Sequence, residues 1–320
     1  MKFVPVIRTL GGLLVLLAAA PATPARAQAT PAGPLVVFNA GSLAKPFNDL
    51  LRAFKSKHPD VVPAQENSGS LEAARKLTEL GKIPDVLAVA DYDVIPKLLI
   101  PKFASWYALF VRTSMVLVYT DQSAGAAEIT ERNWWRILQR PDVRWGHSDP
   151  TLDPAGYRTL MVMQLAELHY HQPGLAARLA AAIPRRYIRP KSADLIALVE
   201  VGELDYAWEY EAIAKRHGLR YVALPPEINL GDTRLGPTYA RASVRLPGAS
   251  RAGSDSVEFR GTPIAYALTI PAAAPHPTTA QAFARFVFSP EGQALLKENG
   301  FMLLEKPLLG GPGQPPPGLF

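Results

Sequence analysis

The sequence predicts an α/β fold of two lobes, each with a mainly parallel sheet flanked by helices. Short apolar runs rich in β-branched residues alternate with amphipathic helical patterns, which is typical of strand–helix–strand units. The chain has 320 residues, enough for about two domains of ~150 residues. Two such blocks follow one another, and a strand and two helices return after the second. Because ligands of open sheets bind beyond the carboxyl ends of strands, we expect a ligand cleft between the lobes.

The first block alternates between strands and helices. Residues 35–40 (LVVFNA) predict a buried strand, and 43–54 place Leu and Phe on one helical face. An extended run begins at Val61, a second amphipathic helix covers 71–80, and 83–90 (IPDVLAVA) predict another buried strand. This order indicates a parallel sheet.

The second block begins near Met115 with a predicted strand at 115–120, and its longest predicted helix is 156–171. Its other predicted elements are helices at 133–139 and 193–201 and extended segments at 188, 205–210 and 221–224. The chain then returns with a strand at 263–270 and helices at 278–288 and 290–299.

These patterns divide the chain into segments. We expect a first lobe at 35–113, a second lobe at 114–255 and a returning part of the first lobe at 256–307. A Pro/Ala/Gly linker precedes them at 28–34, and the Gly- and Pro-rich end, 308–320, is predicted to be a disordered tail.

The N-terminus has the pattern of a secretory signal peptide. Lys2 and Arg8 precede an apolar run at 10–20. The small-x-small triplet at 25–27 then predicts that residues 1–27 are removed. The alternative is an uncleaved membrane anchor, but the apolar run is too short to span a bilayer. We therefore expect export and no stable membrane insertion.

The chain contains no cysteine. This excludes disulfides, thiol catalysis and Cys-based metal sites, and it leaves no residue for a lipid tether. We therefore expect an untethered protein in the periplasm of a two-membrane bacterium. The formal charge of +6 falls once the predicted signal peptide, which is basic and lacks acidic residues, is removed. Basic and acidic residues are interleaved in the remainder, which argues against nucleic-acid binding.

Two glycine–serine pairs stand at the starts of predicted helices in the first block. Gly41–Ser42 follows a strand, and Gly69–Ser70 follows a turn. Each pair offers a hydroxyl and backbone N–H groups at the positive end of a helix dipole, which is an anion-binding arrangement. The alternative is that Ser42 and Ser70 only cap their helices.

The second block offers further candidates for the same site. Asp153 and Pro154 form an ordinary helix start, after which the N–H of Ala155 would face the cleft. Ser192 opens another predicted helix and offers one more N–H, and Tyr210 ends an extended segment with a phenol.

Other chemistries have weaker support. His169 and His171 are two apart on a predicted helix and face different sides, which disfavours a shared metal. Ser42 lacks the GxSxG context of a serine hydrolase, and neither a P-loop nor a dinucleotide fingerprint is present in the sequence.

Five motifs occur in an order that resembles the molybdate/tungstate-binding proteins of ABC importers. The similarity runs from about residue 35 to about 305, and within that group the sequence looks most like the tungstate/molybdate-binding type common in archaea. The motifs are AGSL at 40–43, SGS at 68–70, ADY at 90–92, DPAGYR at 153–158 and RPKSADLIALVEVGELDYAWEY at 189–210.

The resemblance implies the two-lobed periplasmic-binding-protein fold of type II, closing on an oxyanion. It implies serine donors at Ser42 and Ser70, backbone N–H donors near Asp91 and Ala155, and a phenol donor at Tyr210. It also implies a monomer that passes its ligand to a permease and ATPase, with no cofactor, no resident metal and no catalytic residues.

In the closest branch two carboxylates can also reach the metal of the oxyanion and make it six-coordinate. Asp153 matches one of them, whereas Ser192 stands where we expect the other. With one carboxylate left, we predict a tetrahedral anion held by neutral donors, with Ser192 giving its N–H and hydroxyl and Asp153 acting mainly as a helix cap.

Two alternatives remain open. One is a binding protein of the same fold for sulfate, phosphate, ferric ion or an organic anion, in which Asp153 would accept the proton of phosphate. The other is an enzyme, such as an esterase that uses Ser42.

Overall fold

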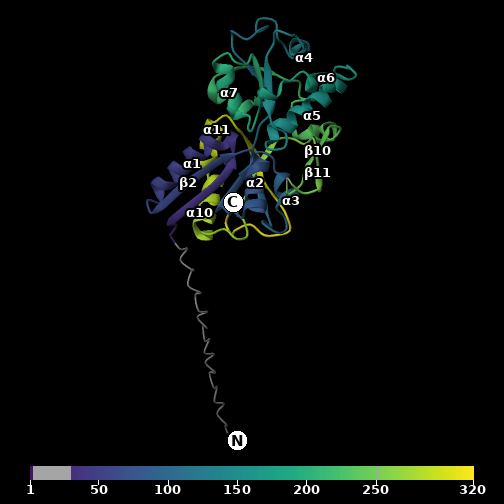
Figure 1. Ribbon diagram of the computed structural model, residues 1–320. Coiled ribbons are helices and arrows are strands. Elements are labelled where there is room, and N and C mark those ends of the chain that lie inside the picture. Colours follow the sequence, from purple (N-terminus) through teal and green to yellow (C-terminus); the bar gives the residue numbers. More distant parts are fainter. Residues whose placement is uncertain (3–29, 251) are drawn as a thin grey trace.

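The computed structural model describes residues 1–2, 30–250 and 252–320. The predicted signal peptide, apart from its first two residues, lies outside the described residues. The described chain forms two sheets with helices packed on them, plus a separate two-stranded hairpin. Figure 1 shows the elements of one sheet in the lower part of the molecule and those of the other in the upper part.

The first lobe is built on a six-stranded sheet with the order β13-β4-β12-β3-β1-β2. Its strands are β1 (Gly33–Ala40), β2 (Val61–Ser68), β3 (Val86–Val89), β4 (Tyr107–Arg112), β12 (Ala265–Thr269) and β13 (Met302–Gly310). The helical elements of this lobe are η1 (Gly41–Leu43), α1 (Ala44–Lys57), α2 (Ser70–Leu80), α3 (Val94–Leu98), α10 (Pro277–Phe288) and α11 (Pro290–Glu298).

The second lobe is built on a five-stranded sheet with the order β7-β6-β8-β5-β9. Its strands are β5 (Met115–Tyr119), β6 (Trp145–Ser148), β7 (Ile188–Arg189), β8 (Tyr206–Tyr210) and β9 (Arg220–Ala223). Its helical elements are α4 (Trp134–Ile137), α5 (Pro154–His169), α6 (Leu175–Ala181), η2 (Arg185–Tyr187), α7 (Ala193–Glu200) and α8 (Glu211–His217).

Both sheets are mixed, which corrects the expectation of mainly parallel sheets. Strand β1 pairs in parallel with β2 and β3, and β6 pairs in parallel with β7 and β8. The other pairs are antiparallel, namely β12 with β3 and β4, β13 with β4, and β5 with β8 and β9. None of these antiparallel pairs is joined by a single crossover helix, the connection that links the parallel neighbours β1 and β2.

Apolar periodicity explains how the helices attach to the sheets. In α1 the buried positions include Phe47, Leu50, Leu51 and Phe54, which share one helical face. Phe47 and Phe54 meet Phe283 of α10 with ring centroids 6.1 and 5.4 Å apart. The first lobe therefore has its own aromatic core, to which the returning part of the chain contributes.

The segments that pass between the lobes lie side by side. The N–H of Met115 donates to the carbonyl of Asn229 at 2.8 Å, and the N–H of Ile264 donates to the carbonyl of Leu230 at 2.8 Å. The N–H of Thr113 in turn donates to the carbonyl of Ile264. The chain thus changes sheets between β4 and β5 at the same place where it returns, as expected of a hinge between lobes.

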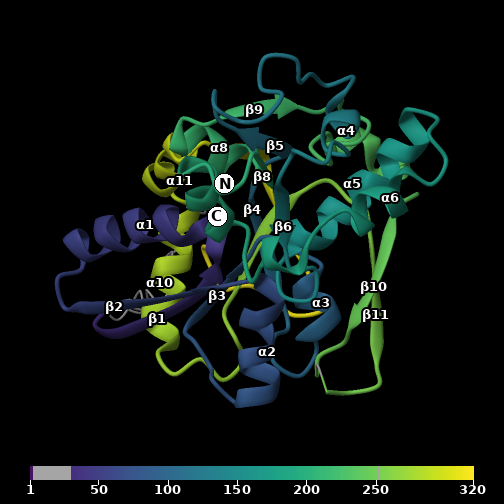
Figure 2. The ribbon, with the colours of Figure 1, turned by 45° about the horizontal axis from the view of Figure 1, so that its top comes forward.

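A hairpin of β10 (Ser243–Pro247) and β11 (Ser256–Arg260) follows η3 (Thr233–Leu235) and α9 (Gly236–Tyr239). It runs along α5 of the second lobe and α3 of the first (Figure 2). The predicted lobe boundary at 255/256 falls at the end of its turn. The lobe boundaries themselves stay predictions.

The expectation of a disordered tail at 308–320 is wrong. Residues 308–310 belong to β13, in which Leu308 pairs with Leu109 of β4 and Gly310 with Tyr107. A Cβ atom on Gly310 would lie 2.1 Å from the Tyr107 ring, so this glycine permits close packing. Further on, the Phe320 ring packs 4.9 Å from that of Phe288.

Among the helices of the described residues, none is long and apolar enough to cross a membrane.

Candidate anion-binding site

The seven predicted site residues all lie buried where the two lobes meet. Ser42, Ser70 and Asp91 follow the carboxyl ends of the adjacent strands β1, β2 and β3. From the second lobe come the starts of α5 and α7 and the end of β8. The exposed fraction of the residue is at most 4% for all seven, which are Ser42, Ser70, Asp91, Asp153, Ala155, Ser192 and Tyr210.

Neither serine of the glycine–serine pairs caps a helix. The N-cap of α1 is Leu43, and the N-cap of α2 is Gly69, which has no side chain. Ser42 lies within η1, and Ser70 is the first residue of α2. The alternative that Ser42 and Ser70 are only helix caps is therefore wrong, and their hydroxyls are available for another purpose.

Three hydroxyls of the site share one hydrogen-bonding pattern, because each accepts a bond from a buried donor. Ser42 Oγ accepts from the Tyr266 hydroxyl at 2.9 Å, and Ser70 Oγ accepts from the Ala90 N–H at 2.9 Å. Tyr210 Oη accepts from Arg158 Nη1 at 2.9 Å. A hydroxyl has one proton to donate, and in all three residues that proton is not used in these bonds.

Asp153 does not act as the helix cap that the sequence predicts. It occupies the N-cap position of α5, but its Oδ2 accepts the N–H of Ser192 at 3.0 Å instead of an N–H of its own helix. Burial raises the pKa of Asp153 to about 6. The carboxyl therefore links the start of α5 to the start of α7.

Both donors of Ser192 are occupied by carboxyl groups. Its N–H binds Asp153, and its Oγ donates to Glu209 Oε1 at 3.0 Å. This arrangement differs from the prediction that Ser192 offers its N–H and hydroxyl to the anion. Ser192 instead lies between two buried carboxyls.

Glu209 is a site residue that the sequence analysis missed. It is fully buried in β8, and its Oε1 also accepts the N–H of Tyr210 at 2.7 Å. Its Oε2 has no hydrogen-bond partner among the described residues. Burial raises the pKa of Glu209 to about 8. A second buried carboxyl, that of Glu209, therefore lies next to Ser192, the position at which the sequence lacks the expected carboxylate.

Asp91 contributes its side chain rather than only its backbone. Its Oδ2 lies 3.1 Å from Arg158 Nη2 and accepts the Tyr157 hydroxyl at 2.5 Å. The neighbouring Ala90 N–H, which is the strand-end donor expected in this region, is taken by Ser70. Asp91 and Arg158 therefore form a buried ion pair between the lobes.

The two lobes also touch through their backbones. The N–H groups of Leu71 and Glu72, in the first turn of α2, donate to the carbonyl of Leu152 at 3.0 and 3.3 Å. A Cβ atom on Gly69 would lie 2.2 Å from the same carbonyl oxygen, so glycine allows this approach. The lobes are therefore closed on one another. The carbonyl of Leu152 accepts hydrogen bonds from N–H groups at the start of α2, a helix start that the sequence predicts to face the anion.

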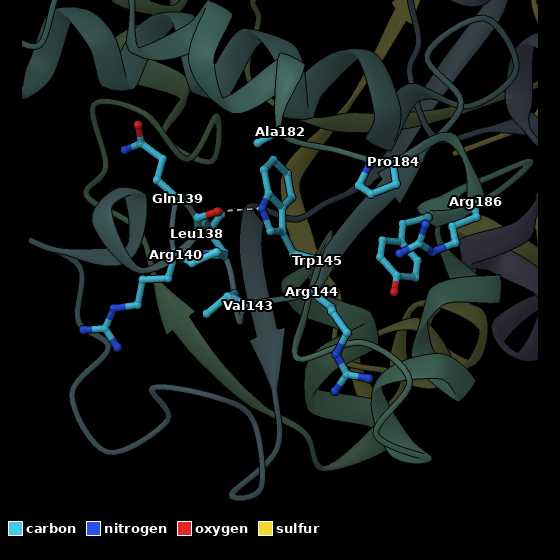
Figure 3. A pocket seen from close by; sticks show the side chains of 11 residues that line it. Leu138, Gln139, Arg140, Val143, Arg144, Trp145, Ala182, Pro184 and Arg186 are labelled. Atoms are coloured by element: carbon cyan, nitrogen blue, oxygen red, sulfur yellow. Dashed lines mark hydrogen bonds between the residues drawn. The ribbon is translucent and has the colours of Figure 1, made fainter.

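A pocket of about 240 Å³ lies on the second lobe, away from these residues. Figure 3 shows Arg140, Arg144 and Arg186 among its lining residues. Arg140 pairs with Glu128 at 2.6 Å, and Arg144 pairs with Asp205 at 3.1 Å. Two of the three guanidinium charges of this pocket are therefore already paired with carboxylates.

Comparisons with known proteins agree with the architecture. Residues 35–302 match the model of the family described as bacterial extracellular solute-binding proteins. The periplasmic molybdate-binding protein of Azotobacter vinelandii has the same fold, with a TM-score of 0.57 at 16% identity over 85% of this chain and 100% of that one.

Two relatives are similar along most of their sequence. A protein of Petrotoga mobilis named "Uncharacterized solute-binding protein" is 46% identical over 268 residues, covering 84% of this chain and 83% of the relative. The molybdate/tungstate-binding protein WtpA of Pyrococcus abyssi is 37% identical over 303 residues, covering 87% and 86%. The resemblance found in the sequence motifs is thereby confirmed.

Proposed function

This chain belongs to the family of bacterial extracellular solute-binding proteins, and from that premise we propose that it captures molybdate or tungstate for an ABC importer. It passes the oxyanion to the membrane permease, whose ATPase drives import. We place it in the periplasm, after removal of the signal peptide predicted at 1–27. It acts as a monomer, requires no cofactor and catalyses no reaction.

The observation that carries this proposal is the shared orientation of three hydroxyls. Ser42, Ser70 and Tyr210 each accept a buried hydrogen bond, so the hydroxyl proton of each remains able to bind an acceptor such as an anion. An oxyanion is an acceptor with several oxygens and no donor. Fixed neutral donors can replace its hydration shell, and bonds to an ionised acceptor are stronger than neutral ones.

The charges of the site support an anion whose central atom can accept more ligands. A buried carboxylate repels a dianion unless it is protonated or bonds the central atom directly. Asp153 and Glu209 both bond Ser192, so two carboxyls are present here, whereas the sequence led us to expect one. We therefore propose that both carboxyls bond the metal of molybdate or tungstate and expand its coordination beyond four.

This arrangement also supplies a basis for selectivity. Sulfate and phosphate have the same tetrahedral shape as molybdate, but sulfur and phosphorus in these ions do not accept two further oxygen ligands. Toward sulfate and phosphate, the carboxyls of Asp153 and Glu209 are only repulsive, or they compete with the ion for hydrogen-bond donors. Discrimination then comes from a cost imposed on the wrong ion as well as from contacts with the right one.

Thermal unfolding with four oxyanions tests the proposal. Tungstate and molybdate should each raise the unfolding temperature, because a ligand at 100 times its Kd stabilises a protein by about 2.7 kcal/mol. Sulfate and phosphate at the same concentration should leave the temperature unchanged within error. Absence of a shift with every oxyanion, or an equal shift with sulfate, would contradict it. Metal-edge absorption of the loaded protein separately distinguishes four-coordinate from six-coordinate metal.

The esterase alternative has no support from the contacts of Ser42. A serine nucleophile needs a neighbouring general base, usually histidine. In the described part of the chain, the hydrogen bond of Ser42 Oγ is with Tyr266, a phenol whose pKa burial raises well above its usual value. Such a phenol stays protonated at neutral pH and cannot take up the proton of the serine. The observations favour a binding protein.

A further inference from the structure

The guanidinium group of Arg158 contacts both lobes and also Tyr210, one of the proposed anion donors. It belongs to α5 of the second lobe and is 2% exposed. Its Nη1 donates to the Tyr210 hydroxyl at 2.9 Å, within the same lobe, and to the carbonyl of Ala90 at 2.7 Å, in the first lobe. Its Nη2 lies 3.1 Å from Asp91 Oδ2, also in the first lobe.

The partners of Arg158 hold the guanidinium in one orientation only while the lobes are together. Asp91 is itself held by the Tyr157 hydroxyl at 2.5 Å, from the same helix as Arg158. If the lobes separated, Arg158 would keep Tyr210 but lose Ala90 and Asp91. A long side chain with one remaining bond gains rotamer freedom, so the bond that orients the Tyr210 hydroxyl would weaken as well.

We propose that Arg158 is a positioning residue that makes the donor orientation of Tyr210 depend on closure of the lobes. In the closed form Arg158 donates a hydrogen bond to the phenol oxygen of Tyr210. The Tyr210 proton therefore points away from the guanidinium and toward the anion. In the open form that direction is not fixed. This inference rests on the proposed function and adds a coupling that none of the anion donors provides alone.

The chemistry of the side chain explains why an arginine is needed here. Its planar group presents several N–H donors in fixed directions, which bind two acceptors, one in each lobe, while the charge pairs with Asp91. It also lies 5.8 Å from the ring centroid of Tyr210 and 6.0 Å from that of Tyr157. Lysine keeps the charge but has neither the fork nor the planar contact, so Arg158→Lys separates positioning from charge.

A double-mutant cycle on tungstate affinity tests the coupling in the full mature chain. Tyr210→Phe should weaken binding about 10- to 100-fold in the parent, as expected for a lost bond to an ion. Arg158→Lys should weaken binding by a similar factor. In the Arg158→Lys background, Tyr210→Phe should cost less than about threefold, because the donor is no longer oriented. Parent-like affinity of Arg158→Lys, or additive effects of the two substitutions, would overturn the proposal.

Two further variants keep the result interpretable. Arg144→Lys is the matched control, because Arg144 pairs with Asp205 inside the second lobe and contacts none of the site residues named above; it should bind tungstate like the parent. Asp91→Asn removes the charged partner in the first lobe, keeps the Ala90 carbonyl and leaves Tyr210 bonded. It should also shrink the effect of Tyr210→Phe, and an undiminished effect would count against the coupling. It serves in place of Arg158→Lys if that variant does not fold.

Small-angle scattering of the anion-free proteins tests this inference independently of the proposed function, because it measures the radius of gyration and not binding. The Arg158→Lys protein should be more open than the parent, with a larger radius of gyration, whatever the parent binds. Equal radii would refute the role of Arg158 in closure. If the parent bound no oxyanion while the radii differed as expected, the proposed function would fail and the closure contact would stand.

Discussion

Ser192 Oγ donates to Glu209 Oε1 at 3.0 Å, so a serine at the start of α7 holds a buried carboxyl beside the anion donors. The same residue binds Asp153 through its N–H. Two carboxyls are thereby brought close to hydroxyl donors that are themselves neutral. This relationship is the basis of the proposal that the carboxyls bond the metal of the oxyanion directly, in place of the tetrahedral, neutral-donor site expected from the sequence.

Replacing Glu209 should change which oxyanion is preferred. Glu209→Gln keeps the hydrogen bonds to Oε1 and removes the ionisable group. We expect tungstate affinity to fall about 10- to 100-fold, since a bond to the metal is lost, while sulfate affinity rises above about pH 8, where Glu209 is ionised and repels a dianion. Titration calorimetry with both ions measures the ratio.

Glu211→Gln is the matched control, because Glu211 lies two residues away on α8 and bonds Ser114 and Lys215. It should leave the ratio of the two affinities unchanged. A Glu209→Gln protein with the parent's preference for tungstate over sulfate would show that Glu209 does not reach the metal.

The pH dependence of binding should report the protons on the two carboxyls. Burial raises the pKa of Asp153 to about 6 and that of Glu209 to about 8. A protonated carboxyl must lose its proton before it bonds a metal, so binding releases protons below these values. Tungstate affinity should therefore rise with pH, by up to about tenfold per unit between roughly pH 6 and 8, and level off above.

The sign of this dependence separates the two modes of coordination. If the anion stayed tetrahedral, ionisation of Glu209 would add a repulsive charge, and affinity would fall over the same interval. Glu209→Gln should flatten the profile between about pH 6 and 8 under either mode, which identifies the titrating group. Proton release measured by calorimetry in two buffers of different ionisation enthalpy gives an independent count.

The sequence predicts local features of this site well, because they depend on neighbouring residues. The glycine–serine pairs, the start of α5 and the end of β8 are all located by short patterns, and the structure brings the residues at those places together. Ser42, Ser70 and Tyr210 each need only the end of a strand or the start of a helix to be recognised.

The missed residues depend on contacts between distant parts of the chain. Ser42 and Tyr266 are 224 residues apart, and Arg158 and Tyr210 are 52 apart. Glu209 gives no pattern of its own, because every residue of β8 is buried and neither face alternates with solvent. Which buried charges pair is decided by the packing of the two lobes, so composition and periodicity do not predict it.

Removing single hydroxyls should weaken anion binding without unfolding the protein. Ser70→Ala deletes a donor but leaves the Ala90 N–H without its partner, so we expect a loss of about 10- to 100-fold in affinity and a drop of a few °C in unfolding temperature. Ser123→Ala is the control, because Ser123 is a buried serine that donates to the carbonyl of Asp205, within the second lobe. It should lower the unfolding temperature but keep the affinity. Equal affinity losses in both variants would mean that the effect is indirect.

Gly69→Ala should hinder closure while leaving each lobe intact. Gly69 has φ −63° and ψ 148°, which alanine adopts without strain, so the substitution is tolerated within the first lobe. The added Cβ would meet the Leu152 carbonyl at 2.2 Å only when the lobes are closed. We expect tungstate affinity to fall at least about tenfold, scattering to show a more open molecule, and the unfolding temperature without anion to change by only a few °C. Gly236→Ala is the matched control, because its nearest atom would be 3.9 Å away. A Gly69→Ala protein that binds tungstate as the parent does would mean that the contact between α2 and Leu152 is not part of the anion-bound form.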